Sequence, residues 1–185
     1  LCEELTMLMR FRAEEKNLFL KLFIDDDVPH FIRSDSMKLR QILINLLGNA
    51  VKFTEAGGVA LHVAVPRSGI LRIAVSDSGR GIAQEAQKSI FEAFVQAANL
   101  SNSKGTGLGL TISRKIAEML GGDMGVESEP EKGSTFWLEI PLQIAENDSG
   151  CSVQEETRKV IGLQSGQPAW RVLAAEDDES SQLFI

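Results

Sequence analysis

Apolar residues follow two periods in the first part of the chain. Residues 1–16 carry them at helical spacing, and residues 18–24 carry them at every second position. The first period predicts an amphipathic helix, and the second predicts a half-buried strand. We expect the buried side of the helix to carry Leu1, Leu5, Leu8 and Met9.

Two longer helices are predicted by their ends as well as by their periodicity. Asp35 is a suitable N-cap for a helix from about Ser36 to Thr54, which Gly57-Gly58 ends. A second helix runs from about Leu108 to Leu120 and ends at Gly121-Gly122. Glycine takes the left-handed conformation that commonly follows a helix, so both glycine pairs are typical stop signals.

Four further strands are predicted near residues 59–65, 70–76, 124–128 and 134–140. Turns at Pro66–Gly69 and Glu129–Gly133 separate them in pairs, and a short helix is expected near Ile90. The elements do not alternate regularly as βαβ units. The pattern therefore predicts an α+β fold, with helices layered on a mainly antiparallel sheet.

The last part of the chain has a different composition. Residues 145–169 are rich in Ser, Gln, Glu and Gly, which is typical of a linker. Val172–Ala175 then resembles a short buried strand that leads into the acidic residues 176–179. Residues 1–144 hold 16 basic and 18 acidic residues, a net charge of −2, whereas residues 145–185 hold 3 and 8, a net charge of −5.

Composition excludes several classes of protein. The 185 residues are 43% apolar and 24% charged, which is ordinary for a globular chain with one well-formed core. A net charge of −7 without a basic block argues against nucleic-acid binding. Cys2 and Cys151 fit neither a disulfide framework nor a zinc site. No membrane-spanning run or signal peptide is visible, so we expect a cytoplasmic protein. The chain starts at Leu1 and stops at Ile185 in an apolar run, so we expect a fragment of a longer protein.

A row of polar residues lies on one face of the first long helix. Gln41, Asn45, Asn49 and Lys52 are spaced i, i+4, i+8 and i+11 between apolar neighbours. One interpretation is an internal hydrogen-bonded network or a solvated stripe. The other is a site in which amide oxygens meet a metal ion and Lys52 meets phosphate oxygens.

Three further motifs carry candidate chemistry. One motif, Asp77-Ser78-Gly79-Arg80-Gly81-Ile82, directly follows a strand. The Asp77 carboxylate would therefore project at the strand end, where it could accept a hydrogen bond from an exocyclic amine. The alternative is an ordinary Asp-x-Gly turn, which is common. Gly105–Leu110 opens the second long helix with three alternate glycines, which favours an anion site and matches neither the Rossmann nor the Walker A spacing. Phe91-Glu92-Ala93-Phe94 is by default a pair of core phenylalanines.

Together, these four motifs resemble the boxes of the ATP-binding catalytic domain of sensor histidine kinases, within the gyrase/Hsp90/MutL-type superfamily. Residues 45–54 resemble the N box, 77–82 the G1 box with Ser78 in place of the usual Thr, 91–94 the F box and 105–110 the G2 box. Residues 133–136 resemble the closing strand motif. The resemblance covers about residues 1–144 and implies a two-layer α/β sandwich of the Bergerat type.

The resemblance also implies roles for individual residues. Asn49 would ligate Mg²⁺, with Asn45 beside it and Lys52 near the phosphates, and residues 95–104 would form a mobile lid. Asp77 would accept from the adenine amine, with Thr135 supporting that region. The implied ATP-binding set is Asn45, Asn49, Lys52, Asp77, Gly79, Gly81, Ile82, Phe94, Lys104, Gly105, Thr106, Gly107, Leu108, Gly109 and Thr135.

Asn45 separates two chemistries within the superfamily. Its ATP hydrolases carry a Glu four residues before the Mg²⁺-binding Asn, where it acts as a general base. An amide cannot take up a proton at neutral pH. We therefore expect slow hydrolysis and transfer of the γ-phosphate to a protein acceptor, with Asn45 and Lys52 as the catalytic pair.

The phosphoacceptor helix of the family is missing. His30 and His62 are the two histidines, the first in a turn and the second in a strand, and both are expected to be structural or surface residues. This fragment should therefore bind ATP and fail to phosphorylate itself. The lid segment is also short, with Lys104 as its one basic residue.

The tail has a second, shorter resemblance. Residues 171–178 are similar to the first strand of a receiver domain, where Glu176 and Asp177 would be the Mg²⁺-binding pair. This suggests a hybrid kinase with an ATP-binding domain at 1–144, a linker at 145–169 and a truncated receiver at 170–185. Its partners would be the parent's phosphoacceptor domain and a receiver or response regulator. The parent would dimerise through the missing segment, so we expect this fragment to be a monomer. A serine kinase of the anti-sigma-factor type and a degenerate, non-catalytic interaction domain are the alternatives.

Overall fold

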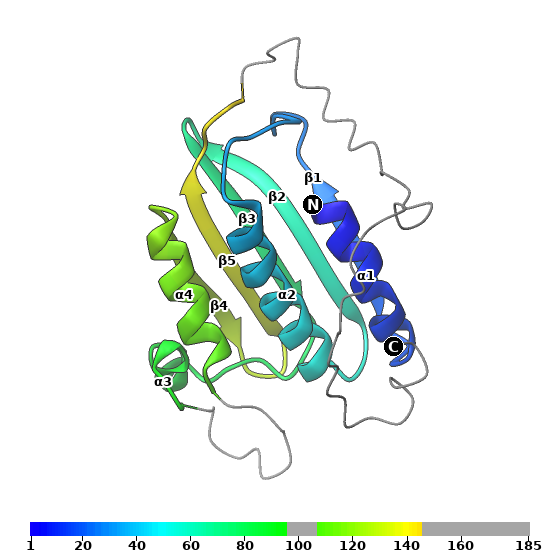
Figure 1. The fold of residues 1–185 in the computed structure, drawn as a ribbon. Coiled ribbons are helices and arrows are strands. Elements are labelled where there is room, and N and C mark those ends of the chain that lie inside the picture. Colours follow the sequence, from blue (N-terminus) through cyan, green and yellow to red (C-terminus); the bar gives the residue numbers. More distant parts are fainter. Residues whose placement is uncertain (96–106, 146–185) are drawn as a thin grey trace, which may run out of the picture. The chain divides into compact units, whose positions relative to one another are not determined.

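The computed structural model describes residues 1–95 and 107–145. Its helices and strands alternate irregularly along the chain (Figure 1). In chain order they are α1 (Cys2–Glu14), β1 (Phe19–Ile24), α2 (Ser36–Phe53), β2 (Gly58–Arg67), β3 (Ile70–Asp77), α3 (Gln84–Gln87), the 3₁₀ turn η1 (Ser89–Phe91), α4 (Gly109–Met119), β4 (Asp123–Glu129) and β5 (Gly133–Pro141).

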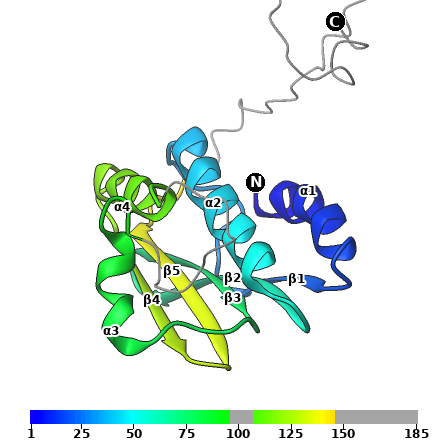
Figure 2. The same cartoon turned by 90° about the horizontal axis from the view of Figure 1, so that it is seen from below.

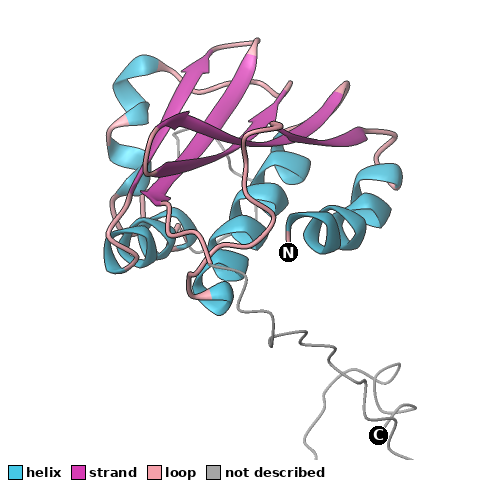
Figure 3. Cartoon of the chain, turned by 90° about the horizontal axis from the view of Figure 1, so that it is seen from above, coloured by secondary structure: helices cyan, strands magenta, loops and turns pink. Residues whose placement is uncertain are grey.

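The five strands form one mixed sheet in the order β1-β2-β3-β5-β4. β1 pairs with β2 in parallel, and the other three pairings are antiparallel. Helices α1, α2 and α4 all lie on the same face of this sheet, as the views from below and from above show (Figures 2 and 3). The predicted α+β fold, with helices on a mainly antiparallel sheet, is confirmed.

The core lies between the helical layer and the sheet. Strand residues of one parity point into it, because successive side chains of a strand alternate between its faces. Leu71, Ile73 and Val75 of β3 are at most 2% exposed, and they belong to the same core cluster as Ile42 and Leu46 of α2. α2 therefore lies across the middle of the sheet, and the residues at its end are held in place by this packing.

The ends of α2 are close to those predicted. The Asp35 side chain accepts a hydrogen bond from the Lys38 backbone N–H at 3.0 Å, as an N-cap does, and it also pairs with the Lys38 ammonium. At the other end, the Thr54 N–H and hydroxyl both donate to the Ala50 carbonyl. These caps satisfy backbone groups that a helix leaves unpaired at its termini.

Two local predictions were wrong. In α1 the buried residues are Leu5, Thr6, Met9 and Ala13, whereas Leu1 and Leu8 are exposed, because the face toward β1 and α2 is centred on Leu5 and Met9. Pro66, for which the sequence predicts a turn, belongs to β2, where the β2–β3 register shifts between Ala64 and Arg67. Proline lacks an N–H and is tolerated where a ladder is irregular.

No helix in the described part of the chain is long and apolar enough to span a membrane. Residues 1–146 form a compact unit. The predicted linker, apart from Ala145, and the predicted receiver start, including Glu176 and Asp177, lie outside the described residues.

Candidate functional site

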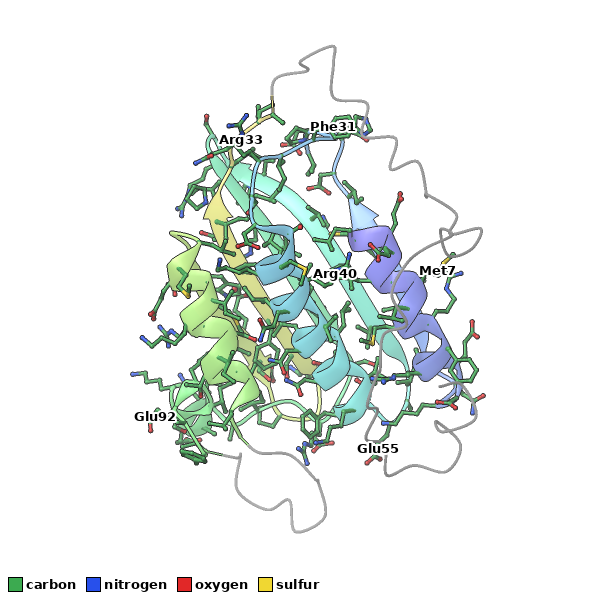
Figure 4. The ribbon with its side chains drawn as sticks, viewed as in Figure 1. Met7, Phe31, Arg33, Arg40, Glu55 and Glu92 are labelled. Atoms are coloured by element: carbon green, nitrogen blue, oxygen red, sulfur yellow. The ribbon has the colours of Figure 1, made fainter. Side chains whose placement is uncertain are left out.

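The motifs singled out from the sequence meet at one end of the helical layer. α2 ends there, β3 ends there, and α4 begins there (Figure 1). Figure 4 labels two residues at this end: Glu55, which follows α2, and Glu92, which follows η1. Phe31 and Arg33 lie at the opposite end (Figure 4). The fold therefore brings together segments that are far apart in the sequence.

The amide of Asn45 is held by protein groups on both sides. Its Nδ2 donates to the hydroxyl of Ser113 at 2.9 Å, and its Oδ1 accepts from Asn49 Nδ2 at 3.4 Å. Ser113 is 1% exposed and belongs to α4. The internal hydrogen-bonded network, one of the two interpretations of this helix face, is therefore present at Asn45, where it connects α2 to α4. Gln41, the first residue of the row, is exposed.

Gly109 explains how α4 can approach α2 so closely. A Cβ at Gly109 would collide with the side-chain amide of Asn45. A glycine is thus needed in the first turn of α4 for steric reasons as well as for any exposure of backbone N–H groups. Ser113 lies one turn further along α4 and belongs to none of the four motifs. Its spacing of four residues from Gly109 is the signal that places it on the same face.

Lys52 is the last basic residue of α2 and is exposed. Its ammonium lies 5.0 Å from the centroid of the Phe53 ring, and the guanidinium of Arg80 lies 5.0 Å from the same ring. Both cations are within the distance for cation–π attraction. Arg80, which has no assigned role in the sequence analysis, therefore adds a second positive charge beside Lys52.

Asp77 is the last residue of β3 and is partly buried. Its Oδ1 accepts a hydrogen bond from the Gly79 N–H at 2.8 Å. Burial raises the pKa of the Asp77 carboxyl, and hydrogen bonds from the backbone N–H groups of Gly79 and Ser134 act in the opposite direction. A desolvated carboxylate with spare lone pairs is suited to accept a hydrogen bond from a ligand amine.

The glycines after Asp77 allow close backbone contacts. A Cβ at Gly79 would lie 2.6 Å from the Phe53 carbonyl oxygen, and a Cβ at Gly81, where φ is +68°, would collide with the Glu129 carbonyl. The loop therefore packs against the end of α2 on one side and the β4–β5 turn on the other. Ile82, which follows, is partly buried.

Ser128 of β4 supports this loop. Its hydroxyl accepts from the Ile82 N–H at 2.8 Å and donates to the Gly133 carbonyl at 2.9 Å, with the Ser134 hydroxyl also at 2.9 Å. Gln87 bridges the Ile82 and Ser128 carbonyls at 3.0 and 2.7 Å. Ser128 is not predictable from the sequence, because no local motif marks a hydroxyl that acts across 46 residues.

The two phenylalanines of 91–94 have different environments. Phe91 is buried and packs edge-on against Phe136, with the Arg114 guanidinium 5.1 Å from its ring. Phe94 is 76% exposed and has a φ of +64°. The default expectation of two core phenylalanines is therefore wrong for Phe94, because the chain turns outward after η1.

Phe94 also contacts the glycine segment before α4. Its N–H donates to the Gly107 carbonyl at 3.2 Å, and a Cβ at Gly107, where φ is +69°, would lie 3.1 Å from the Phe94 backbone. Leu108 is the N-cap residue of α4, without a side-chain cap. Lys104, Gly105 and Thr106, and with them most of the predicted lid, lie outside the described residues.

Thr135 does not lie with Asp77. It is paired with Ser76, and the two hydroxyls are 2.9 Å apart, whereas Ser134 is the register partner of Asp77. Because side chains alternate along a strand, Thr135 points to the sheet face opposite the helices, and Ser134 shares the face of Asp77. The prediction that Thr135 supports the region of Asp77 is therefore wrong. Ser134, which is 7% exposed, is the residue in that position.

Both histidines are exposed, as expected. His62 Nε2 lies 2.7 Å from Asp25 Oδ1, and its ring meets Phe23 edge-on. His30 is in the segment between β1 and α2. Neither residue belongs to a helix.

The described residues contain no cluster of three or more His, Cys, Asp or Glu side chains that could hold a metal ion. Oxygen donors that suit Mg²⁺ are nevertheless present on α2. Asn49 is partly buried, and because its Nδ2 donates to Asn45, its Oδ1 is the end available for a cation. One amide oxygen fits an ion that takes its other ligands from phosphate groups and water.

The fold and site together define a nucleotide-binding ATPase class. Its features are a two-layer sandwich, a carboxylate at a strand end, a helix that carries amide side chains and a second helix that begins at a glycine. Residues 34–144 match the model of the histidine kinase-, DNA gyrase B-, and HSP90-like ATPase family, and the chain belongs to this family. The chain is 46% identical over 151 residues to the sensor histidine kinase AruS of Pseudomonas aeruginosa, covering 78% of this chain and 15% of AruS.

Two other relatives are a histidine-protein kinase and a sensory/regulatory protein. The chain is 39% identical over 151 residues to the signal transduction histidine-protein kinase BarA of Escherichia coli K12, covering 78% of this chain and 16% of BarA. It is 37% identical over 205 residues to the sensory/regulatory protein RpfC of Xanthomonas campestris, covering 97% of this chain and 28% of RpfC. The chain thus spans less than a third of each of these relatives.

Solved structures agree with the family. Full-length ShkA in complex with AMPPNP superposes with a TM-score of 0.72 at 42% identity, covering 78% of this chain and 30% of ShkA. The catalytic domain of the histidine kinase ThkA gives a TM-score of 0.65 at 30% identity, covering 76% of this chain and 90% of that domain. The two-layer sandwich is therefore the fold of histidine kinase catalytic domains.

Proposed function

We propose that this chain binds Mg²⁺–ATP at the end of its helical layer and supplies the γ-phosphate for phosphorylation of a histidine in a two-component phosphorelay. The histidine would lie on a phosphoacceptor domain of the parent protein, and a receiver or response regulator would take the phosphate next. The proposed domains are 1–144 for ATP binding, 145–169 as a linker and 170–185 as the start of a receiver. We place this chemistry in the cytoplasm.

The observation that carries the proposal is the convergence of three segments around one site. Asp77 offers a desolvated acceptor, and Asn49 and Lys52 lie on the last turns of α2. Gly109 sets the start of α4 against Asn45. The site therefore offers an acceptor for an amine, an amide oxygen for a cation, and a positive charge with a helix N-terminus for phosphate groups. An Mg²⁺-nucleotide presents an amine, a cation and phosphate groups together.

Each residue would have a limited task. Asp77 would accept from the adenine amine, and Gly79 and Gly81 would let the base come close to the backbone. Lys52 would offset phosphate charge, and the N-terminus of α4, from Gly107 to Gly109, would face the phosphates. Asn49 would hold Mg²⁺, which screens phosphate charge when bound.

Asn45 favours transfer over hydrolysis. Its amide cannot accept a proton from water, and both of its ends are occupied by Ser113 and Asn49. No general base would therefore be available at this position. The γ-phosphorus would instead be attacked by a neutral imidazole nitrogen of the partner, the bond to the β–γ bridging oxygen would break, and ADP would leave.

The first test is titration calorimetry with Mg²⁺–AMPPNP. We expect saturable 1:1 binding, and the absence of binding at millimolar analogue would favour the degenerate interaction domain. Purified chain alone should release phosphate from ATP slowly and should not become labelled by γ-labelled ATP. When a phosphoacceptor domain of a relative such as BarA is added, label should appear on that domain and be lost in acid; an acid-stable label would indicate a serine kinase.

A further inference from the structure

The C-terminal end of α2 is capped by a side chain from outside the helix. The ammonium of Lys16 donates to the carbonyl oxygens of Val51 and Lys52, both at 2.9 Å, and to that of Thr54 at 3.3 Å. Lys16 is 35 to 38 residues away in the sequence, in the turn between α1 and β1. An ammonium has three donors, and all three are used.

These contacts pair two further carbonyls at the end of α2. The last four carbonyls of a helix have no partner within it. Here the Ala50 carbonyl accepts from Thr54, those of Val51 and Lys52 accept from Lys16, and that of Phe53 packs against Gly79. A positive charge at this position also interacts favourably with the negative end of the helix dipole.

The backbone of Lys16 is itself fixed by the end of α1. Leu18 N–H donates to the Ala13 carbonyl and Asn17 N–H to the Glu14 carbonyl, both at 2.9 Å, with Asn17 at a φ of +56°. This is a Schellman motif, and its two apolar residues, Ala13 and Leu18, are 0% and 4% exposed. Lys16 therefore starts from a rigid turn.

The turn that Lys16 holds carries the basic end of the candidate site. Lys52 and Phe53 belong to it, and the Phe53 carbonyl sets the position of Gly79, whose N–H in turn holds Asp77. A shift of this turn would move the Lys52 ammonium and the Asp77 carboxylate together. The contacts thus run from α1 through Lys16 to both ends of the site.

We infer that Lys16 is a positioning residue for nucleotide binding, which aligns the last turn of α2 with the loop after β3. It is not a catalytic residue, because its donors are directed at main-chain carbonyls. The inference rests on the proposed function, since it concerns the same site. It also connects α1 directly to that site. Nearer the N-termini of the same two helices, Arg40 of α2, which is labelled in Figure 4, forms two hydrogen bonds with Glu4 of α1 at 2.8 and 2.9 Å.

The test compares Lys16→Met with Lys16→Arg in the full 185-residue chain. Met keeps the length of the side chain and removes the donors, whereas Arg keeps both charge and donors. Lys21→Met is the matched control, because Lys21 is an exposed lysine on β1 whose ammonium lies over the Phe19 ring. Binding of Mg²⁺–AMPPNP is measured by calorimetry well below the melting temperature of each variant.

We expect Lys16→Met to weaken binding about three- to tenfold, Lys16→Arg to stay within about twofold of wild type, and Lys21→Met to be unchanged. Equal affinities for Lys16→Met and wild type would overturn the inference. So would a loss in Lys16→Met that Lys16→Arg does not restore, since charge and donors at this position would then not be what nucleotide binding requires.

A second measurement needs no nucleotide. In ¹⁵N–¹H spectra of the free protein, Lys16→Met should shift the amide signals of residues 51–54 and of Gly79 and Arg80, and Lys21→Met should not. If wild type fails to bind AMPPNP, the proposed function fails, while these spectra still decide whether Lys16 aligns the two segments. If Lys16→Met does not fold, Lys16→Gln takes its place, and unshifted amides in that variant contradict the inference.

Discussion

At the scale of single residues, Asp77 combines a functional position with a cost in stability. Burial raises the pKa of its carboxyl, so ionisation is less favourable in the folded chain than in the unfolded chain. Such a group contributes stability at low pH that is lost as the pH rises through the folded-state pKa. The ionised carboxylate therefore destabilises the fold at neutral pH, which is consistent with a residue kept for a ligand rather than for stability.

Asp77→Asn tests this balance. At pH 7 the variant should be more stable to thermal unfolding by on the order of 1 kcal/mol, because an amide can still accept from Gly79 without burying charge. The gain should shrink as the pH falls below the folded-state pKa of Asp77, where the wild-type carboxyl is neutral as well. Binding of Mg²⁺–AMPPNP should fall by more than about tenfold, since an amide that keeps its bond to Gly79 presents donors to the adenine amine.

Asp26→Asn is the control for that comparison, since Asp26 is an exposed carboxylate in the turn after β1. It should alter neither stability nor affinity. An Asp77→Asn variant that is less stable than wild type at pH 7, or whose difference in stability does not vary with pH, would contradict the argument from burial.

Two glycines of the site region should respond in opposite ways to alanine. Gly48 lies inside α2 with no atom within 4 Å of the position that a Cβ would take, so Gly48→Ala should stabilise the fold by roughly 0.5–1 kcal/mol through helix propensity. At Gly79 the added Cβ would meet backbone of α2 at 2.6 Å, so Gly79→Ala should destabilise the fold by about 1–3 kcal/mol. Urea unfolding of both variants gives the comparison, and a neutral Gly79→Ala would show that the loop is not held against α2.

At the scale of elements, the sequence predicted the helices and strands well where the signal is local. Asp35 caps α2 as expected, and the strand periodicity located β2, β3, β4 and β5 to within a few residues. The exceptions share one cause. Which side of α1 is buried, where Pro66 lies and which face Thr135 occupies all depend on a partner element that a local pattern does not contain.

The candidate site divides in the same way. Residues in contiguous motifs, such as Asn49, Lys52 and Asp77, could be proposed from the sequence because each has a typical neighbourhood in the chain. The residues that hold those motifs in place, namely Lys16, Ser113, Ser128 and Ser134, are common side chains whose contacts span 6 to 68 residues or join adjacent strands. No spacing rule marks such residues, so the structure is needed to find them.

The end of β4 supports the loop after Asp77, and Ser128 makes the central contacts. Ser128→Ala would leave the Ile82 N–H without its acceptor and the Gly133 carbonyl without its donor. The expected cost is about 1–3 kcal/mol in the free energy of unfolding, together with weaker AMPPNP binding, measured by urea unfolding and calorimetry. Ser68→Ala, at an exposed position of the β2–β3 hairpin, should change neither quantity; equal behaviour of the two variants would contradict the supporting role.

At the scale of the whole molecule, the site and the core belong to the same unit. The fully buried apolar residues extend from Leu5 to Ile140, and the compact unit ends at Glu146. A chain cut after Glu146 should therefore melt within about 2 °C of the full chain and bind Mg²⁺–AMPPNP with an affinity within about twofold. Differential scanning calorimetry and titration of both lengths provide the measurement. A drop in melting temperature of more than about 5 °C would mean that residues 147–185 contribute to the stability of the ATP-binding unit, and the proposed division into an ATP-binding domain, a linker and a receiver start would have to be redrawn.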